Sequence, residues 1–317
     1  MAAIYGSVEE LIGRTPLLEL HSVARACGAQ ARLVAKLEGQ NPAGSVKDRV
    51  ARSMIADAEE RGLLTPDCVV IEPTSGYTGI GLAAVCASRG IRLIIVMPST
   101  MSAERRALIG AYGAQLVLTD GKLGMAGAIA RAEELQREIP HSFIAGQFYN
   151  PANPRAHLES TGPEIFADTD GAVDIFLAGV GSGGTISGTG AYLKQQKPSV
   201  RVVAVEPASS AVLSGEPAGS HKIQGIGAGF VPENYNPAVV DEVVAVTDED
   251  AFAAARLLGE KQGILCGISS GAVLSAGMEL AKKRENRDKT IVMLFADTGE
   301  RYLSAGLFPA QETGEPL

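Results

Sequence analysis

Residues 174–185 read Asp174-Ile175-Phe176-Leu177-Ala178-Gly179-Val180-Gly181-Ser182-Gly183-Gly184-Thr185, a short apolar run followed by a glycine-rich loop. An apolar run of this length is typical of a strand that is covered on both faces of a parallel sheet. A loop with so many glycines lets backbone amides surround an anion, and Thr185 adds a hydroxyl group. We therefore expect a buried strand that ends at an anion-binding loop.

The same alternation of short apolar runs and helical patterns extends over most of the chain. Further strands are predicted at Arg32–Glu38, Val69–Glu72, Leu93–Met97, Gln115–Leu118, Arg201–Glu206 and Ile291–Ala296. Helical periodicity covers Lys47–Arg61 and Ser102–Tyr112, which stop at Gly62 and Gly113, residues suited to a left-handed helix cap. Strands that alternate with helices in this way predict an α/β fold with parallel sheets.

The length of the chain favours two domains. It has 317 residues, and a domain usually has roughly 100 to 200. The segment Gly146–Pro154 is the richest in turn residues, so we place the boundary beside it. This division gives an N-terminal domain of residues 1–147 and a C-terminal domain of residues 148–317.

Composition and charge exclude several classes of protein. Hydrophobic residues make up 46% of the chain and charged residues 20%, which indicates a compact globular protein. A net charge of −8 and a pI near 5.2 offer no basic surface to a nucleic acid. The longest apolar runs, Leu82–Ala87 and Ile291–Ala296, are far shorter than the roughly 20 residues that cross a bilayer. The first ten residues contain Glu9 and Glu10 and no basic segment, so we expect a cytoplasmic protein without a secretory signal.

The cysteines and histidines do not form a pattern typical of metal ligands. The cysteines are widely separated and are expected to be buried free thiols: Cys27, Cys68, Cys86 and Cys266. The histidines offer no pair at i, i+4 and are expected in surface or capping roles: His21, His141, His157 and His221. We therefore expect no metal site.

A lysine-bearing loop lies between the first predicted strand and the helix after it. Residues 40–47 read Gln40-Asn41-Pro42-Ala43-Gly44-Ser45-Val46-Lys47. Lysines are mostly exposed, so a solvated Lys47 is the simplest interpretation. Burial beside the positive end of a helix would instead lower the pKa of this amine and make it nucleophilic. This loop alone leaves both interpretations open.

A second loop, rich in hydroxyl groups, follows the strand at residues 69–72. It reads Glu72-Pro73-Thr74-Ser75-Gly76-Tyr77-Thr78-Gly79 and also precedes a helix. Its backbone amides and hydroxyls would lie at the positive end of that helix, which suits a carboxylate or a phosphate. An ordinary N-cap by Ser75 or Thr78 is equally consistent with the pattern.

Two glycine motifs suggest other enzyme classes. Gly179, Gly181 and Gly184 satisfy G-x-G-x-x-G, and Glu206 ends the next strand, so a nicotinamide-dinucleotide oxidoreductase stays open as an alternative. The segment Gly267-Ile268-Ser269-Ser270-Gly271 matches the G-x-S-x-G of hydrolases. All the histidines lie before Ser269, however, whereas that fold places its histidine after the nucleophile, so we exclude a hydrolase.

Taken together, the loops closely resemble one enzyme family. They read Asn41-Pro42-Ala43-Gly44-Ser45-Val46-Lys47-Asp48-Arg49, Thr74-Ser75-Gly76-Tyr77-Thr78-Gly79, Gly181-Ser182-Gly183-Gly184-Thr185 and Gly267-Ile268-Ser269-Ser270-Gly271. Similar motifs, from about Val8 to Phe308, are Ile12–Leu17, Gln147–Pro154, His221–Gly229 and Asp297–Tyr302. The family is cysteine synthase (O-acetylserine sulfhydrylase), which binds pyridoxal 5′-phosphate (PLP) and has the tryptophan-synthase-β type fold.

The resemblance implies a fold and a set of site residues. The fold is PLP fold type II, two doubly wound α/β domains with the cofactor cleft between them and about the first 35 residues packing on the other domain. Lys47 is implied to bind the cofactor covalently, and Ser269 to face its pyridine nitrogen. The implied phosphate cradle is Gly181, Ser182, Gly183, Gly184 and Thr185. The implied substrate contacts are Thr74, Ser75, Gly76, Thr78, Gln147 and Gly225.

Tyr77 departs from the family pattern. The family has an asparagine here that contacts the 3′-oxygen of the cofactor and the substrate. A phenol is much larger than a short amide, so it either narrows the pocket or turns outward and leaves its role to Thr78 or Ser75. This departure leaves the donor and the acceptor open, with O-phosphoserine, cysteine or serine as alternative donors.

The resemblance also implies a reaction and partners. The reaction is β-replacement on O-acetyl-L-serine with sulfide, which gives L-cysteine and acetate and makes the protein a PLP-dependent transferase. The implied assembly is a homodimer, with a serine acetyltransferase tail as a possible partner in the cleft. Domain closure in the family implies that the loops at residues 74–78 and 225–229 move when substrate binds.

Overall fold

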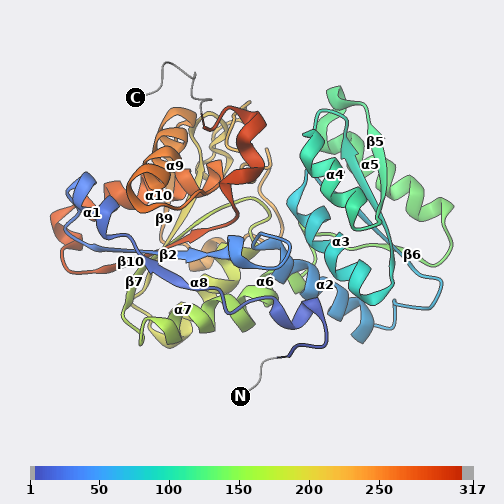
Figure 1. Ribbon diagram of the computed structural model, residues 1–317, viewed down its shortest axis with the longest axis horizontal. Helices are drawn as coiled ribbons and strands as arrows, with labels where there is room; N and C mark the ends of the chain where they lie inside the picture. The colour runs from blue at the N-terminus through green and yellow to red at the C-terminus, as the bar shows by residue number, and fades with distance from the viewer. Residues whose placement is uncertain (1–3, 309–317) are drawn as a thin grey trace, which may run out of the picture.

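The computed structural model describes residues 4–308 and contains two twisted sheets covered by helices (Figure 1). The larger sheet has the order β1 (Leu17–Glu19), β2 (Arg32–Leu37), β10 (Thr290–Phe295), β7 (Val173–Gly179), β8 (Arg201–Pro207) and β9 (Glu242–Val246). The smaller sheet has the order β5 (Gln115–Thr119), β4 (Arg92–Pro98), β3 (Val69–Pro73) and β6 (Ser142–Ile144). All neighbouring strands are parallel except β1 and β2. The predicted α/β fold class is confirmed.

Helices and short helical turns connect these strands. The helices are α1 (His21–Cys27), α2 (Lys47–Glu60), α3 (Tyr77–Arg89), α4 (Ala103–Ala111), α5 (Gly124–Glu138), α6 (Ala152–Ala156), α7 (Gly162–Asp168), α8 (Gly184–Gln196), α9 (Asp248–Gln262) and α10 (Ile268–Lys282). A π-helical turn, His157–Thr161, joins α6 to α7. Short 3₁₀ helices lie at Val8–Leu11, Glu38–Gln40, Gly121–Leu123, Ala208–Ser210, Val212–Ser214, Pro237–Val239, Arg284–Asn286 and Gly299–Ala305.

The apolar runs became strands because both faces of each sheet are covered. In β7, Ile175 and Leu177 belong to one hydrophobic cluster, whereas Phe176 and Ala178 belong to another on the opposite face. Figure 1 shows α9 and α10 on one side of this sheet and α7 and α8 on the other. A strand buried on both faces has no polar positions, which explains its continuous hydrophobicity.

The predicted strands and helices match the structure closely. Each of the seven predicted strands is present, with ends that differ by one residue at most. Helices α2 and α4 are followed by Gly62 (φ 69°) and Gly113 (φ 84°), as their stop signals predicted. Three strands were missed, because β1 and β6 have only three residues and β9 is a partly exposed edge strand.

The structure corrects two expectations about single residues. His157 is completely buried rather than at the surface or in a capping role, because the π-helical turn directs it into the space under α8. Cys27 is half-buried, since it lies at the end of the short helix α1, whereas Cys68, Cys86 and Cys266 are buried. All four thiols are free, as expected.

The N-terminal strands do not lie in the sheet formed by the segment that follows them. Strands β1 and β2 lie in the larger sheet, where β2 pairs with β10 from the end of the chain. Strand β6 forms one edge of the smaller sheet and ends just before Gly146–Pro154. We propose a division into an N-terminal domain of residues 1–147 and a C-terminal domain of residues 148–317. In this division, strands β1 and β2 of the N-terminal domain pack on the C-terminal domain.

Candidate active site

Two adjoining cavities lie where the carboxyl ends of the strands in both sheets face each other. Both are lined by Lys47, Tyr77, Gly181, Ser182, Gly225 and Ile226. Crevices at the carboxyl ends of parallel strands are the usual ligand sites of α/β folds, because the loops there are free to vary.

Four helices begin at these cavities without a side-chain cap. They are α2, α3, α8 and α10, whose N-cap residues are Val46, Gly76, Gly183 and Gly267. Helices α1, α5, α6 and α7 also lack a side-chain cap, whereas α4 and α9 are capped by the hydroxyls of Ser102 and Thr247. Uncapped N-termini present backbone N–H groups and the positive ends of helix dipoles, so the cavities suit anionic groups.

Lys47 lies between the two cavities, at the first residue of α2. Its side chain is half-buried, and its amine has neither a hydrogen bond nor an ion pair within residues 4–308. Burial lowers the pKa of this amine to about 8, although the nearby Asp297 carboxylate acts in the opposite direction. About a tenth of the amine is therefore neutral and nucleophilic at pH 7, and about half at pH 8.

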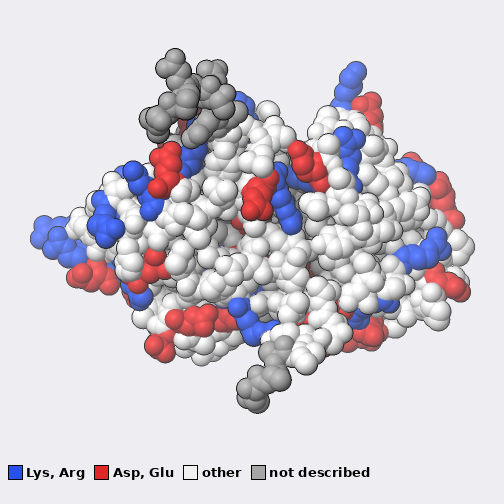
Figure 2. All heavy atoms as spheres, viewed as in Figure 1, with Lys and Arg blue, Asp and Glu red and all other residues white. Residues whose placement is uncertain are grey.

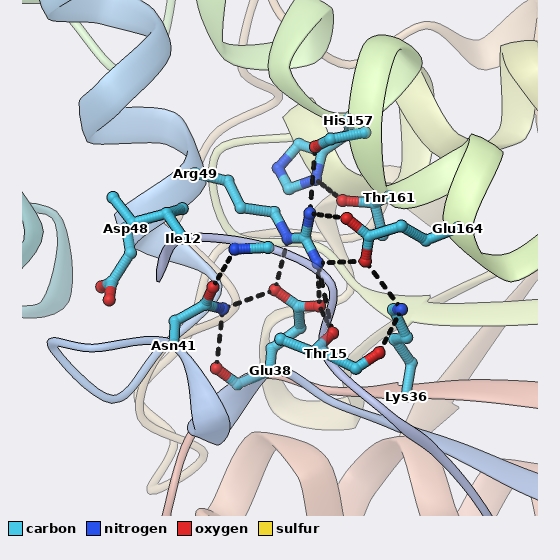
Figure 3. A network of polar contacts seen from close by, with 12 residues as sticks. Ile12, Thr15, Lys36, Glu38, Asn41, Asp48, Arg49, His157, Thr161 and Glu164 are labelled. Atoms are coloured by element: carbon cyan, nitrogen blue, oxygen red, sulfur yellow. Dashed lines mark hydrogen bonds and ion pairs between the residues drawn. The ribbon is translucent and has the colours of Figure 1, made fainter. Parts of the chain in front are cut away.

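A buried ionic network holds the helix that carries Lys47 (Figure 3). Arg49, two residues along α2, donates to both oxygens of Glu38, to Glu164 and to Thr15. Lys36 donates to Glu164 at 2.8 Å, which ties β2 to α7. Because these contacts join β2, α2 and α7, they fix the start of α2 relative to the larger sheet.

The glycine loop lines the first cavity and is closely packed from behind. Gly183 has φ 83°, and a Cβ at this position would lie 2.7 Å from the backbone nitrogen of Tyr235. A Cβ on Gly181 would lie 2.5 Å from the Gly225 carbonyl oxygen. Only glycine fits these two positions, so the loop can curve around a ligand with its own amides.

The second cavity brings the predicted substrate loop together with Gln147. The Thr78 hydroxyl donates a 2.6 Å hydrogen bond to Oε1 of Gln147. Gly146 and Gln147 are held in turn by backbone N–H bonds to the fully buried Glu72 carboxylate. Burial raises the pKa of Glu72 to about 7 despite these bonds. The cavity thus has a polar wall that suits a carboxylate.

Most of the predicted site residues line one or both cavities. Those at the first cavity are Lys47, Tyr77, Gly181, Ser182, Gly183, Thr185, Gly225 and Ser269. Those at the second are Lys47, Thr74, Ser75, Tyr77, Thr78, Gln147, Gly181, Ser182 and Gly225. Gly76 and Gly184 are not among the lining residues: Gly76 packs on Arg105, and Gly184 packs on Asn153. Gly76 and Gly184 therefore lie behind the residues that line the cavities.

Tyr77 points inward. Its side chain is only 9% exposed, and its hydroxyl has no hydrogen-bond partner in the part of the chain that the structure describes. The guanidinium carbons of Arg105 and Arg301 lie 5.0 and 5.3 Å from its ring centroid, within cation–π distance. Of the two orientations left open by the sequence, the structure therefore has the one that narrows the pocket.

Three residues of the site were not predicted. Asp297 lines the first cavity and accepts a 2.6 Å hydrogen bond from the Tyr302 hydroxyl, while burial raises the pKa of this carboxyl group. Arg105 lines the second cavity. Asp297 and Tyr302 could have been found from the motif Asp297–Tyr302 that follows the apolar run of β10, whereas nothing local marks Arg105.

Residues 4–308 contain no group of three or more side chains that could hold a metal ion. No helix in this range is long and apolar enough to span a membrane. Figure 2 shows basic and acidic side chains interspersed on one face of the molecule.

Comparison with known proteins identifies the family. The profile of the family described as pyridoxal-phosphate dependent enzyme matches residues 8–297. The chain belongs to the family of pyridoxal-phosphate dependent enzymes. The expected family, fold type and cofactor are thereby confirmed, and PLP is the cofactor of this enzyme.

The most similar proteins include cysteine synthases. Cysteine synthase A of Escherichia coli is 49% identical over 97% of each chain. The structure of O-acetyl serine sulfhydrylase isoform 3 from Entamoeba histolytica has a TM-score of 0.94 and 50% identity over 99% of this chain and 94% of that one. A hydrogen sulfide-producing enzyme from Fusobacterium nucleatum is 44% identical, with a TM-score of 0.91, over 95% of this chain and all of that one.

The first cavity fits PLP. The glycine loop and the uncapped start of α8 suit its phosphate, and the amine of Lys47, with its lowered pKa, suits its carbonyl group. The nicotinamide alternative, in contrast, is wrong. Membership of this family contradicts it, and the Glu206 carboxylate is already used by Leu213 and Ser214, so it is not free to bind a ribose.

Proposed function

We propose that this PLP-dependent enzyme catalyses β-replacement on O-acetyl-L-serine with sulfide, giving L-cysteine and acetate. The observation that carries the proposal is the position of Lys47, whose amine has no partner among residues 4–308 and lies between the glycine loop and a second polar cavity. The similarity to cysteine synthase A over 97% of both chains supports the choice of substrates.

The residues take the following roles. The loop Gly181–Thr185 would hold the phosphate of the cofactor, Ser269 would face its pyridine nitrogen, and Tyr77 would lie beside its ring; all of them except Gly184 line the first cavity. Bound PLP supplies an electron sink for negative charge at the α-carbon of the substrate. A neutral serine hydroxyl beside the pyridine nitrogen does not enforce a proton there, which keeps this sink mild and suited to β-elimination and β-addition.

Lys47 moves the proton. The neutral Lys47 amine would act as the general base that takes the proton from the α-carbon of the substrate. The loop Thr74–Thr78 and Gln147 hold the substrate carboxylate through their backbone N–H, hydroxyl and amide groups. Acetate leaves from the β-carbon, and hydrosulfide adds there with return of a proton, so that O-acetylserine and hydrosulfide become cysteine and acetate.

The proposal is tested with the purified holoenzyme. O-acetylserine and sulfide should give cysteine and acetate in equal amounts, and the Lys47→Ala variant should give neither. Borohydride reduction followed by peptide mapping should place the pyridoxyl group on Lys47. A pyridoxyl group on another lysine would refute the assignment of Lys47, and failure with every β-substituted alanine would refute the reaction.

A second candidate reaction differs in the donor or the acceptor. The inward phenol of Tyr77 narrows the pocket where the family has a short amide. O-phosphoserine, cysteine or serine could then replace O-acetylserine as donor, and another thiol or an amine could replace sulfide. Comparing kcat/KM over this panel decides between them, because one preferred pair should exceed the others by at least about tenfold, equivalent to about 1.4 kcal/mol.

We further propose a homodimer located in the cytoplasm. Free thiols with no disulfide among the described residues are typical of a reducing compartment, which supports the location. A serine acetyltransferase tail is the proposed partner, bound through its carboxylate in the second cavity. Sedimentation should give a dimer at micromolar concentration, and a peptide with that tail's sequence should compete with O-acetylserine.

A further inference from the structure

Arg301 lies against the loop that carries Lys47. The arginine belongs to the 3₁₀ helix Gly299–Ala305, which follows β10, and its Nη2 donates a hydrogen bond to the carbonyl oxygen of Ala43. A Cβ on Gly44 would collide with the same nitrogen, so the guanidinium group packs directly on the loop. The position of the Lys47 loop therefore depends on where this guanidinium group lies.

Asp48 holds the same loop from its other end. The backbone N–H of Ala43 donates a 2.6 Å hydrogen bond to Oδ2 of Asp48, in the first turn of α2. Figure 3 shows the Asp48 side chain directed away from the network around Arg49. Asp48 is almost completely buried, and its Oδ1 has no hydrogen-bond partner within residues 4–308. One buried carboxylate oxygen beside the loop is thus without a donor.

Arg301 and Asp48 lie close enough to interact, yet they form no ion pair. Burial raises the pKa of Asp48 to about 7, while the Ala43 N–H and the charge of Arg301 act in the opposite direction. Arg301 is half-buried and forms no ion pair with any described residue, and its Nη1 has no hydrogen-bond partner in that part of the chain. Charges that are removed from water normally pair, so another contact must hold this guanidinium group away from Asp48.

The ring of Tyr77 supplies that contact. The guanidinium carbon of Arg301 lies 5.3 Å from the ring centroid, and Tyr77 is almost completely buried. The attraction between a cation and an aromatic ring strengthens when both are shielded from water. Arg105 packs on the same ring at 5.0 Å, and its two terminal nitrogens are bonded to Ser75 and Gln224, so the ring itself is held in place.

Asp297 does not compete with Asp48 for Arg301. Both carboxyl groups interact with the charge of Arg301. However, Oδ2 of Asp297 accepts the hydrogen bond from Tyr302, and its Oδ1 faces Gly267 so closely that a Cβ there would collide with it. Asp48 is therefore the carboxyl group with an oxygen available to this guanidinium group.

We propose that Arg301 is a positioning residue for Lys47. The ring of Tyr77 keeps its guanidinium group on the Ala43 carbonyl by holding it away from Asp48. The asparagine of the family has no ring for this contact, which makes the arrangement a consequence of Tyr77. Because Tyr77 also lies in the proposed carboxylate loop, the contact joins the substrate side of the cleft to the lysine. The inference rests on Lys47 as the cofactor-binding lysine, as in the proposed function.

Crystal structures of the holoenzyme and of two ring variants test the contact directly. Tyr77→Phe keeps the ring, whereas Tyr77→Leu keeps an apolar side chain without a ring. We expect Arg301 on the Ala43 carbonyl in the unmodified chain and in Tyr77→Phe, and paired with Asp48 in Tyr77→Leu. Arg301 still on Ala43 in Tyr77→Leu, or paired with another carboxylate, would overturn the proposal, whatever reaction the enzyme catalyses.

The rate at which apoprotein attaches PLP reports the position of Lys47. We expect Tyr77→Leu to slow attachment by about tenfold, and Tyr77→Phe by less than about twofold, because only the first removes the ring. Tyr5→Leu is the matched control: Arg14 lies 5.7 Å from the Tyr5 ring, at a partly exposed position outside both cavities. Its rate should equal that of the unmodified chain, and equal rates in the two Tyr77 variants would contradict the proposal.

Removing the competing carboxylate separates an effect through Arg301 from a direct contact of Tyr77 with the cofactor. Asp48→Asn keeps an oxygen that can accept from the Ala43 N–H but has no charge to attract Arg301. In the double variant Tyr77→Leu/Asp48→Asn, attachment should return to within about twofold of the Asp48→Asn rate. A rate as low as that of Tyr77→Leu alone would show that Tyr77 does not act through Arg301.

Arg301→Met completes the cycle, because methionine fills space but neither stacks as a cation nor donates to Ala43. It should slow PLP attachment about as much as Tyr77→Leu does, and the two changes together should slow it no more than either one alone. Thermal midpoints measured beside the rates show whether stability changes in parallel. Rates that multiply in the double variant would mean that the two residues act independently, which would overturn the proposal.

Discussion

Arg105 on α4 donates a 2.6 Å hydrogen bond from Nη2 to Oε1 of Gln224, a residue 119 positions later in the chain. Its Nη1 donates at the same time to the carbonyl oxygen of Ser75 at 2.9 Å. One side chain, which lines the second cavity, thus joins the proposed carboxylate loop to the segment that leads into Gly225–Gly229.

We expect Gln224→Leu to release this connection. Losing one hydrogen bond to a charged group is worth about 1.5 kcal/mol or more, so amide hydrogen exchange at residues 225–229 should become about tenfold faster without substrate. Exchange read by mass spectrometry checks this, with the exposed Gln136→Leu as control. Unchanged exchange would mean that the bond does not restrain the loop.

The pKa of Lys47 predicts how cofactor attachment depends on pH. Only the neutral amine attacks a carbonyl group. With a pKa of about 8, half of the Lys47 amine is neutral at pH 8, whereas less than about 1% of an amine of pKa 10.5 is neutral at that pH. The rate of PLP attachment to apoprotein should therefore rise with pH, reach half its maximum near pH 8 and level off above about pH 9. Stopped-flow absorption measures this rate, and a rise that continues to pH 10 would contradict the lowered pKa.

Tyr77→Asn should bring the chemistry closer to that of the family. The smaller amide widens the pocket and can bond to substrate and cofactor, so acetate release from O-acetylserine should accelerate by about 10-fold to 150-fold, the equivalent of 1.5 to 3 kcal/mol. Tyr77→Phe removes only the hydroxyl group and keeps the ring, which separates size from hydrogen bonding. Equal rates in all three proteins would show that this position does not control the reaction.

Glu164 predicts a loss of stability in acid. Burial alone would raise its pKa, but the hydrogen bonds and charges of Arg49 and Lys36 outweigh burial and lower it from 4.5 to about 2. A carboxylate with a lowered folded-state pKa stabilises the fold above pH 4.5, and this contribution disappears as the pH falls toward 2. We expect the free energy of unfolding to decrease by about 2 kcal/mol from this group between pH 5 and pH 2.5.

Urea denaturation at several pH values measures this loss. Glu164→Gln should be less stable than the unmodified chain at pH 5 and should lose less stability on acidification, because its side chain does not titrate. Glu138→Gln, from an exposed ion pair on α5, is the matched control and should follow the unmodified chain. Parallel curves for all three proteins would show that Glu164 does not carry the acid sensitivity.

The amino-acid sequence by itself determined the elements and the chemistry of their loops. A strand such as β7 is apolar at every position because both its faces are covered, so burial leaves a continuous local signal. Gly62 and Gly113 end their helices because a left-handed cap is a property of a single residue. Loop composition likewise indicated anion binding and, through the resemblance, the cofactor.

Only the tertiary structure decided which side chains meet. The pairing of β2 with β10, the burial of His157 and the bond from Arg105 to Gln224 all join segments that are far apart in the chain. The inward orientation of Tyr77 depends on two guanidinium groups from α4 and the C-terminal segment. Periodicity and turn chemistry act over a few residues, whereas such contacts depend on how whole elements pack, and no local pattern records that.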